Sequence, residues 1–213
     1  MTNPRCLALL GMAVLGTGCF RGRLPPLELY RLTSPDSGAE APRLPSVTTI
    51  AIAPYVTPGL YGDASIVFRK DEAEYGTYPT REWAMPLSTM LGLLTQDVLR
   101  ARPISGGRVI FDPPRRRSET FVWEGTVREF EEVDRPPRVF AAVRLDARLV
   151  RNSDNVVVWI GSARAEREVG DSRSMAAVVL TLSDLAAEVV AKLAVDARAV
   201  LAAPAVSAGR PPQ

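Results

Sequence analysis

Residues 61–99 constrain the fold of this 213-residue chain more than any other stretch. The stretch begins with a β-branched and aromatic run at residues 66–69, which is typical of a strand. A polar turn at residues 71–74 then leads into a second, aromatic run that contains Tyr75 and Tyr78. These two runs predict a β-hairpin.

A helix is predicted directly after this hairpin. Pro86 suits the first helical position, because its φ angle is already fixed there and its missing N–H would have no partner. Apolar side chains then recur at helical spacing in one stripe: Leu87, Met90, Leu91, Leu94 and Val98. The unit is therefore read as strand, strand, helix.

This unit resembles the ABC-type transport auxiliary lipoproteins, of which the paraquat-inducible-protein-C-like proteins are the best known. The resemblance is carried by the extended Ile-Val-x-Arg segment at residues 66–69, the aromatic run, and the sequence W-A-x-P-L at residues 83–87. Strands at residues 30–32 and 50–55 and a terminal helix extend it over most of the chain. Met85 stands where the family pattern has an acidic residue.

The first residues have the features of a secretory signal. Residues 1–18 contain one early base, an apolar run at residues 6–15, and small residues just before Cys19. The apolar run is too short to span a hydrocarbon core of about 30 Å as a helix. A small-residue stretch that ends in cysteine resembles the lipobox of bacterial lipoproteins, which implies an acylated Cys19 as the mature N-terminus. Residues 19–26 would then be a lipidated tether; a plain signal peptide and an unprocessed anchor are the alternatives.

The composition excludes several kinds of chemistry. The chain has no histidine, which rules out a histidine general base, a Ser-His triad and histidine metal ligands. Its only cysteines are Cys6 and Cys19, so the later residues hold neither a disulfide nor a thiolate metal site. The net charge of +2 is too small to recruit nucleic acid, and there is no glycine-rich phosphate loop. We therefore expect no cofactor, no metal and no nucleic-acid partner.

Carboxylate catalysis is also not expected. The closest acid pairs are Glu72 with Glu74 and Glu131 with Glu132. Both pairs are predicted to lie in charged turns, where water keeps carboxyl pKa values ordinary. The chain is accordingly predicted not to be an enzyme.

The remaining patterns predict one α+β domain at residues 27–203, with an antiparallel or mixed β-sheet packed against two main helices. Alternating runs near residues 121–128 and 139–149, followed by a run at residues 156–160 that is apolar on both faces, predict an antiparallel meander. The last run is predicted to be a central strand. Ser174 is the predicted cap of the final helix. Its apolar stripe is Val178, Leu182, Leu185, Val189 and Leu193. Residues 204–213 are predicted to be a disordered tail.

The resemblance implies an outer-membrane-anchored periplasmic lipoprotein that acts as a non-catalytic auxiliary component of an ABC/MCE-type envelope transport system for lipids or other apolar molecules. The outer-membrane assignment rests on Phe20, because lipoprotein sorting to the inner membrane uses aspartate at that position. The implied partners are an MCE-domain protein, the transporter's permease and ATPase, and the membrane itself through the lipid anchor; a second copy of the chain is a further candidate.

Five aromatic residues are the predicted partner-binding residues: Tyr55, Tyr61, Tyr75, Tyr78 and Trp83. The alternative for these rings is packing between sheet and helix. The competing functional class is a lipoprotein that regulates or assembles another envelope machine, such as a cell-wall synthase or an outer-membrane assembly complex. A periplasmic enzyme is a third reading.

Overall fold

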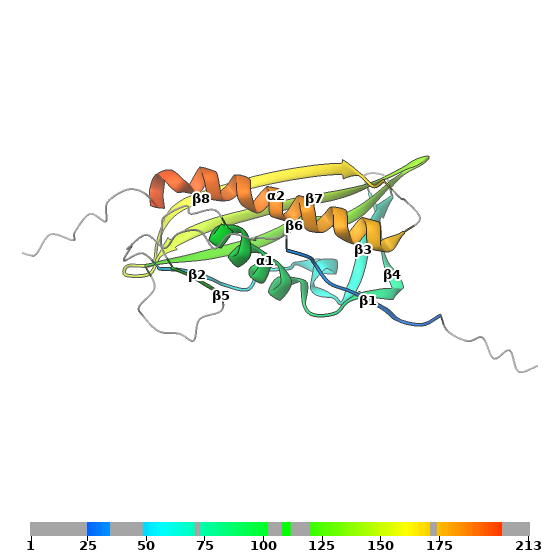
Figure 1. Cartoon of the computed structure of the whole chain (residues 1–213), viewed down its shortest axis with the longest axis horizontal. Helices are drawn as coiled ribbons and strands as arrows, with labels where there is room; N and C mark the ends of the chain where they lie inside the picture. Colours follow the sequence, from blue (N-terminus) through cyan, green and yellow to red (C-terminus); the bar gives the residue numbers. More distant parts are fainter. Residues whose placement is uncertain are drawn as a thin grey trace, which may run out of the picture.

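The computed structural model describes residues 25–34, 49–70, 73–101, 108–111, 120–170 and 174–201. Within them, a mixed sheet of eight strands is covered on one face by two helices (Figure 1), which confirms the predicted α+β class. The strands are β1 (Glu28–Tyr30), β2 (Thr49–Ile52), β3 (Ser65–Lys70), β4 (Glu74–Trp83), β5 (Arg108–Phe111), β6 (Phe121–Arg135), β7 (Arg138–Arg151) and β8 (Val156–Glu168). The helices are η1 (Gly59–Gly62), α1 (Leu87–Ala101) and α2 (Met175–Leu201). The predicted signal, the acylated Cys19 and the predicted tail lie outside the described residues.

Strand β6 is the strand on which the others assemble. Along one side it pairs antiparallel with β7, which in turn pairs antiparallel with β8, so the predicted meander is confirmed. Along its other side, β2 pairs in parallel with the first residues of β6 and β3 pairs in parallel with the last. The hairpin β3–β4 is also confirmed. Strands β1 and β5 complete the sheet by pairing in parallel with β4 and β2.

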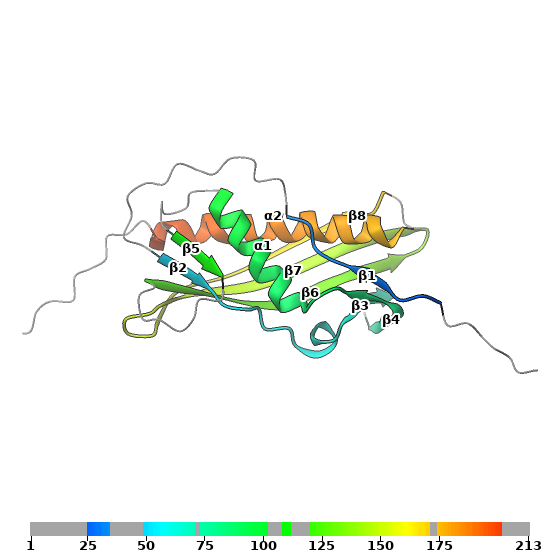
Figure 2. The same cartoon turned by 60° about the horizontal axis from the view of Figure 1, so that its bottom comes forward.

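The two helices bury the apolar stripes that the sequence predicts. Helix α1 begins directly after Pro86, and all five residues of its stripe are buried. Helix α2 is capped by Ser174, whose Oγ accepts a hydrogen bond from the Ala177 N–H at 3.3 Å, and its stripe is also buried. Both helices therefore close the core against one face of the sheet (Figure 2).

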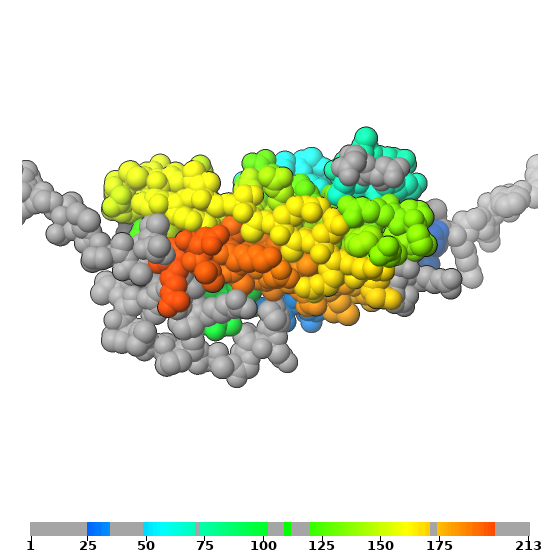
Figure 3. All heavy atoms as spheres, turned by 90° about the horizontal axis from the view of Figure 1, so that it is seen from above, coloured from blue at the N-terminus to red at the C-terminus, as the bar shows by residue number. Residues whose placement is uncertain are grey.

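The prediction that residues 156–160 form a central strand is wrong. In the part of the chain that the structure describes, strand β8 pairs only with β7, and Figure 3 shows it beside α2 along one long side of the molecule. The side chains of Val156, Val157 and Ile160 are 45%, 40% and 73% exposed. Only the inward side chains are covered; Trp159 packs on Trp123 with ring centroids 5.6 Å apart. Apolarity on both faces predicts a strand, but it does not show whether a neighbouring strand pairs with the second edge.

Candidate functional site

Two consecutive glutamates near the end of β6 form the centre of the main polar cluster in the described part of the chain. Glu131 is 0% exposed and Glu132 is 7% exposed, so the prediction of a charged, hydrated turn is wrong. Strand β6 continues to Arg135, beyond an irregularity in its pairing with β7 between Val127 and Glu129. Because successive side chains of a strand point to opposite faces, each glutamate meets a different set of partners.

Glu131 is held by side chains from β3 and η1. Its carboxylate accepts a hydrogen bond from the Arg69 Nε at 2.6 Å and a second one from the Tyr61 hydroxyl. The Arg69 guanidinium carbon also lies 5.9 Å from the centre of the Tyr75 ring. Burial and the hydrogen bond to Glu131 raise the pKa of Tyr61 well above its ordinary value, so Tyr61 stays a hydrogen-bond donor. The four side chains form one network around a buried ion pair.

Glu132 lies on the other face and is held by the hairpin strand β4. The Tyr78 hydroxyl donates to Glu132 Oε1 at 2.8 Å, and the Tyr78 ring packs on Phe68 with centroids 5.0 Å apart. The Arg81 guanidinium carbon lies 4.8 Å from the centre of the Tyr78 ring. Burial raises the pKa of the Glu132 carboxyl, and the hydrogen bond from Tyr78 opposes that rise only in part. Burial and Glu132 together raise the pKa of Tyr78.

The five predicted partner-binding residues divide into three groups. Tyr75 is 47% exposed, whereas Tyr61 and Tyr78 are half-buried by the contacts with the glutamates. Tyr55 and Trp83 are only 3% and 5% exposed, so both rings belong to the core and offer no surface to a partner. For Tyr55 and Trp83, the structure agrees with the alternative prediction, in which the rings pack inside the molecule.

Both core rings have specific partners inside the molecule. The Tyr55 hydroxyl lies 2.8 Å from the Thr95 Oγ1 and accepts a hydrogen bond from the Trp123 indole N–H at 3.2 Å. Trp83 packs edge-on against Phe130, with ring centroids 5.8 Å apart. The first set of contacts joins the segment after β2 to α1 and to the start of β6, and the second joins β4 to β6 near the hairpin.

Sequence reasoning missed Arg69, Glu131 and Glu132 as functional candidates. The available signal was two adjacent acids between the apolar residues Phe130 and Val133. If this segment is a strand in the core, the acids are buried as well, and buried charges need partners. The partners themselves were not visible locally, since Arg69 and Tyr61 precede Glu131 by 62 and 70 residues.

The sheet face that carries Glu131 also bears ion pairs between neighbouring strands. Arg148 pairs with Glu124, Arg128 with Asp146, and Arg164 with Glu129. Most of these side chains are well exposed to solvent, and exposed pairs contribute little to stability. This face is therefore a solvated surface with balanced charges, in contrast to the buried ion pair at Glu131.

A groove of about 840 Å³ runs along the other side of the molecule, lined by α1, α2 and β8. Val98, Ala101 and Ala187 are among its apolar lining residues. Its charged lining includes Glu188 and Lys192, which pair with each other at 2.7 Å. No group of three metal-ligating side chains occurs among the described residues. In the same residues, neither helix is both long enough and apolar enough to cross a membrane.

The chemistry of the glutamate cluster favours binding over a reaction. Each carboxylate is already used by a tyrosine, and in one case also by an arginine, so the polar atoms satisfy one another. On the Glu131 side, the cluster presents the exposed ring of Tyr75 and the half-buried ring of Tyr61, and tyrosine is common in protein interfaces. The half-buried ring of Tyr78 lies on the other face, with Glu132.

Comparison with known proteins places these features in a family. A family model described as the ABC-type transport auxiliary lipoprotein component matches residues 30–194, from the end of β1 through most of α2. No curated protein matches the chain.

Two crystal structures share the fold. A protein of Xanthomonas campestris superposes with a TM-score of 0.62 at 23% identity, over 78% of this chain and 91% of that one. An uncharacterized protein superposes with a TM-score of 0.65 at 14% identity, over 81% of this chain and 99% of that one.

Proposed function

The chain belongs to the family of ABC-type transport auxiliary lipoproteins, and from that premise we propose that it is a non-catalytic component of an ABC/MCE-type envelope transport system for lipids or other apolar molecules. It would be anchored by acyl chains at Cys19 to the periplasmic face of the outer membrane. The observation that carries the proposal is the family match over residues 30–194, which includes both helices' core stripes and the glutamate cluster.

The geometry of the cluster is consistent with an auxiliary role. A buried arginine–glutamate pair fixes the hairpin to β6, and the hairpin carries Tyr75 at its surface. Such a support positions aromatic rings without the conformational-entropy cost of ordering them on binding. We propose that the tyrosine surface on the Glu131 side, formed by Tyr61 and Tyr75, contacts an MCE-domain protein or the transporter's permease. Tyr78 lies on the other face, where it donates to Glu132.

The anchor is tested by the mass of the mature protein. If Cys19 is acylated, the mature polypeptide begins at Cys19 and carries two or three acyl chains. Each buried CH₂ of these chains adds about 0.8 kcal/mol of membrane-binding free energy, so together they hold the protein stably at a bilayer. The Cys19→Ser variant should be unprocessed or lose the acyl mass. A mature N-terminus at another residue would refute the anchor.

The partner surface is tested by affinity purification from envelopes of cells that produce Tyr75→Ala. Replacing an anchor tyrosine costs about 2 kcal/mol or more in binding, about thirtyfold in affinity, whereas an exposed ring contributes little to folding. Ile160→Ala, at an apolar residue 73% exposed on β8, is the matched control. We expect loss of the permease, ATPase and MCE protein with Tyr75→Ala only, at an unchanged melting temperature.

Two results would redirect the proposal. Equal recovery of partners with both variants would place the interface away from the hairpin. Recovery of a cell-wall synthase or an outer-membrane assembly complex in place of a transporter would favour the competing class, a regulator or assembly factor of another envelope machine.

A further inference from the structure

Strand β1 exposes two leucines at the edge of the sheet. Leu27, just before the strand, is 54% exposed and Leu29, within it, is 60% exposed. Residues two apart in an extended segment share a face, so the two side chains form one apolar strip. The intervening Glu28 and the following Tyr30 turn the other way; the Tyr30 hydroxyl donates to Glu28 at 2.6 Å, and Tyr30 also packs against the core.

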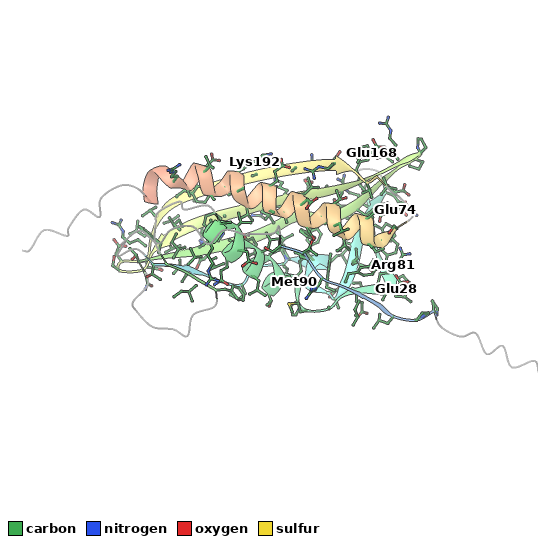
Figure 4. The ribbon with its side chains drawn as sticks, viewed as in Figure 1. Glu28, Glu74, Arg81, Met90, Glu168 and Lys192 are labelled. Atoms are coloured by element: carbon green, nitrogen blue, oxygen red, sulfur yellow. The ribbon has the colours of Figure 1, made fainter. Side chains whose placement is uncertain are left out.

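The apolar strip lies at an edge of the sheet, where protective polar side chains are usual. Among the described residues, β1 pairs only with β4, and edge strands are usually protected by charge or by a covering element. A single exposed leucine would need no explanation, but Leu29 on the edge strand and Leu27 just before it expose two apolar side chains on one face. The one acidic side chain of β1, Glu28, is paired with Arg81 at 3.5 Å, and the two lie at the same corner of the molecule in Figure 4.

The length of chain before β1 restricts what can cover the strip. Leu27 follows Cys19 by eight residues, which span at most about 29 Å when fully extended. Pro25 and Pro26 favour an extended path for the last part of that distance. A lipid-anchored Cys19 therefore keeps the strip within about 29 Å of the membrane surface, before any protein partner is considered.

The charge of the same segment suits a lipid surface. Residues 20–32 contain three arginines, Arg21, Arg23 and Arg31, against the single acid Glu28. Basic residues next to a membrane are attracted to anionic headgroups. Apolar side chains flanked by arginines are the pattern of segments that lie in the boundary between headgroups and acyl chains.

From these observations we propose that Leu27 and Leu29 form a membrane-contacting strip, which docks the β1 edge of the domain onto the bilayer that holds the acyl anchor. The inference rests on the proposed anchor at Cys19. It adds an orientation: the end of the molecule with β1 and the β6–β7 turn faces the lipid, and the end with the β7–β8 turn faces away from it (Figure 1).

The test places an environment-sensitive fluorophore on a cysteine at position 29 of the mature, acylated protein in vesicles. Cys6 lies in the predicted leader and the Cys19 sulfur is acylated, so Leu29→Cys carries the one thiol that reacts. Ile160→Cys is the matched control, because Ile160 is also an exposed apolar strand residue but lies near the opposite end. Nitroxide-labelled lipids, with the nitroxide near the headgroups, serve as the quencher.

We expect most of the fluorescence at position 29 to be lost on adding the nitroxide lipid, with little loss at position 160. The difference should be larger in vesicles of phosphatidylcholine with phosphatidylglycerol than in phosphatidylcholine alone. Equal quenching at the two positions would overturn the inference. So would a signal at position 29 that changes only after an envelope protein is added, because the strip would then be a protein interface.

The mass of the same labelled protein separates this inference from the one on which it rests. A protein without acyl chains contradicts the anchor and overturns the membrane strip with it. An acylated protein whose position 29 stays in water overturns the strip alone and leaves the anchor standing.

Discussion

Arg69→Met should be among the most damaging single substitutions outside the apolar core. The variant keeps most of the side-chain volume but leaves Glu131, whose side chain is 0% exposed, without the cation that lies 2.6 Å away. Removing one partner of a buried ion pair typically costs about 3–5 kcal/mol, because the remaining charge stays desolvated. For a domain of this size, 1 kcal/mol corresponds to a shift of about 2–4 °C, so we expect the melting temperature to fall by about 6–20 °C.

A double-mutant cycle separates the ion pair from simple loss of packing. Arg69→Met combined with Glu131→Leu removes both charges, and apolar replacement of a whole buried pair is often close to neutral. The double variant should therefore be more stable than Arg69→Met alone, although it loses two interactions. Urea unfolding followed by tryptophan fluorescence measures each free energy, because Trp83 packs on Phe130, the neighbour of Glu131.

The reasoning fails if Arg69→Met costs less than about 1 kcal/mol, the range of an exposed pair. It also fails if the two substitutions are simply additive, since additivity would mean that Arg69 and Glu131 do not interact.

Three further predictions follow from contacts described above. The raised pKa of Glu132 means that the native state holds the carboxyl proton of Glu132 more tightly than the unfolded state does. The protonated carboxyl therefore contributes its full stabilisation below the ordinary pKa of 4.5, and this stabilisation is lost as the pH rises through the native pKa. Glu132→Gln, which cannot ionise, should therefore gain stability relative to the parent protein between pH 4 and pH 7 in urea titrations, and a constant difference would contradict the raised pKa. Gly125→Ala should destabilise the protein by about 1–3 kcal/mol in thermal melts, because its new Cβ would lie 2.2 Å from the Tyr55 ring, and Gly125→Ala with Tyr55→Ala should not show this clash. Ser174→Ala should cost about 0.5–2 kcal/mol through loss of the α2 cap, whereas an unchanged melting temperature would show that the cap hydrogen bond contributes nothing.

Periodic patterns in the sequence predicted the local elements well. The stripes of α1 and α2, the hairpin after Ser65 and the meander of β6, β7 and β8 all depend on spacing within one segment, and each was found as predicted. These elements are set by which side chains must be buried together over a few residues, and a local pattern contains that information.

The wrong predictions concern the partners that a strand or helix finds in distant parts of the chain. Glu131 and Glu132 were expected in water because they were predicted to lie in a charged turn, yet Arg69, Tyr61 and Tyr78 reach them from distant parts of the chain. Pairing between distant segments leaves no periodic signal in a single sequence.

The same limit explains the other two errors. Residues 156–160 satisfy the pattern of a strand buried on both faces, but no second neighbour pairs with β8 in the described residues. Tyr55 was predicted to bind a partner, yet it is buried, and its hydroxyl accepts a hydrogen bond from the Trp123 indole and lies 2.8 Å from the Thr95 Oγ1.

The position of β6 has a consequence for the order in which the chain folds. The strands β6, β7 and β8 are neighbours in sequence and are joined by short turns, so they pay little loop-closure entropy when they pair. Strands β2 and β3 pair with β6 across separations of more than 50 residues, which makes their docking the slow part of folding. During synthesis or passage through a membrane, the N-terminal strands emerge first but have no sheet to join. Strands β3 and β4 can already pair as a hairpin, but β2 and β3 cannot join β6 until that strand has emerged. The junction between the N-terminal strands and the meander is therefore the last part of the sheet to become native.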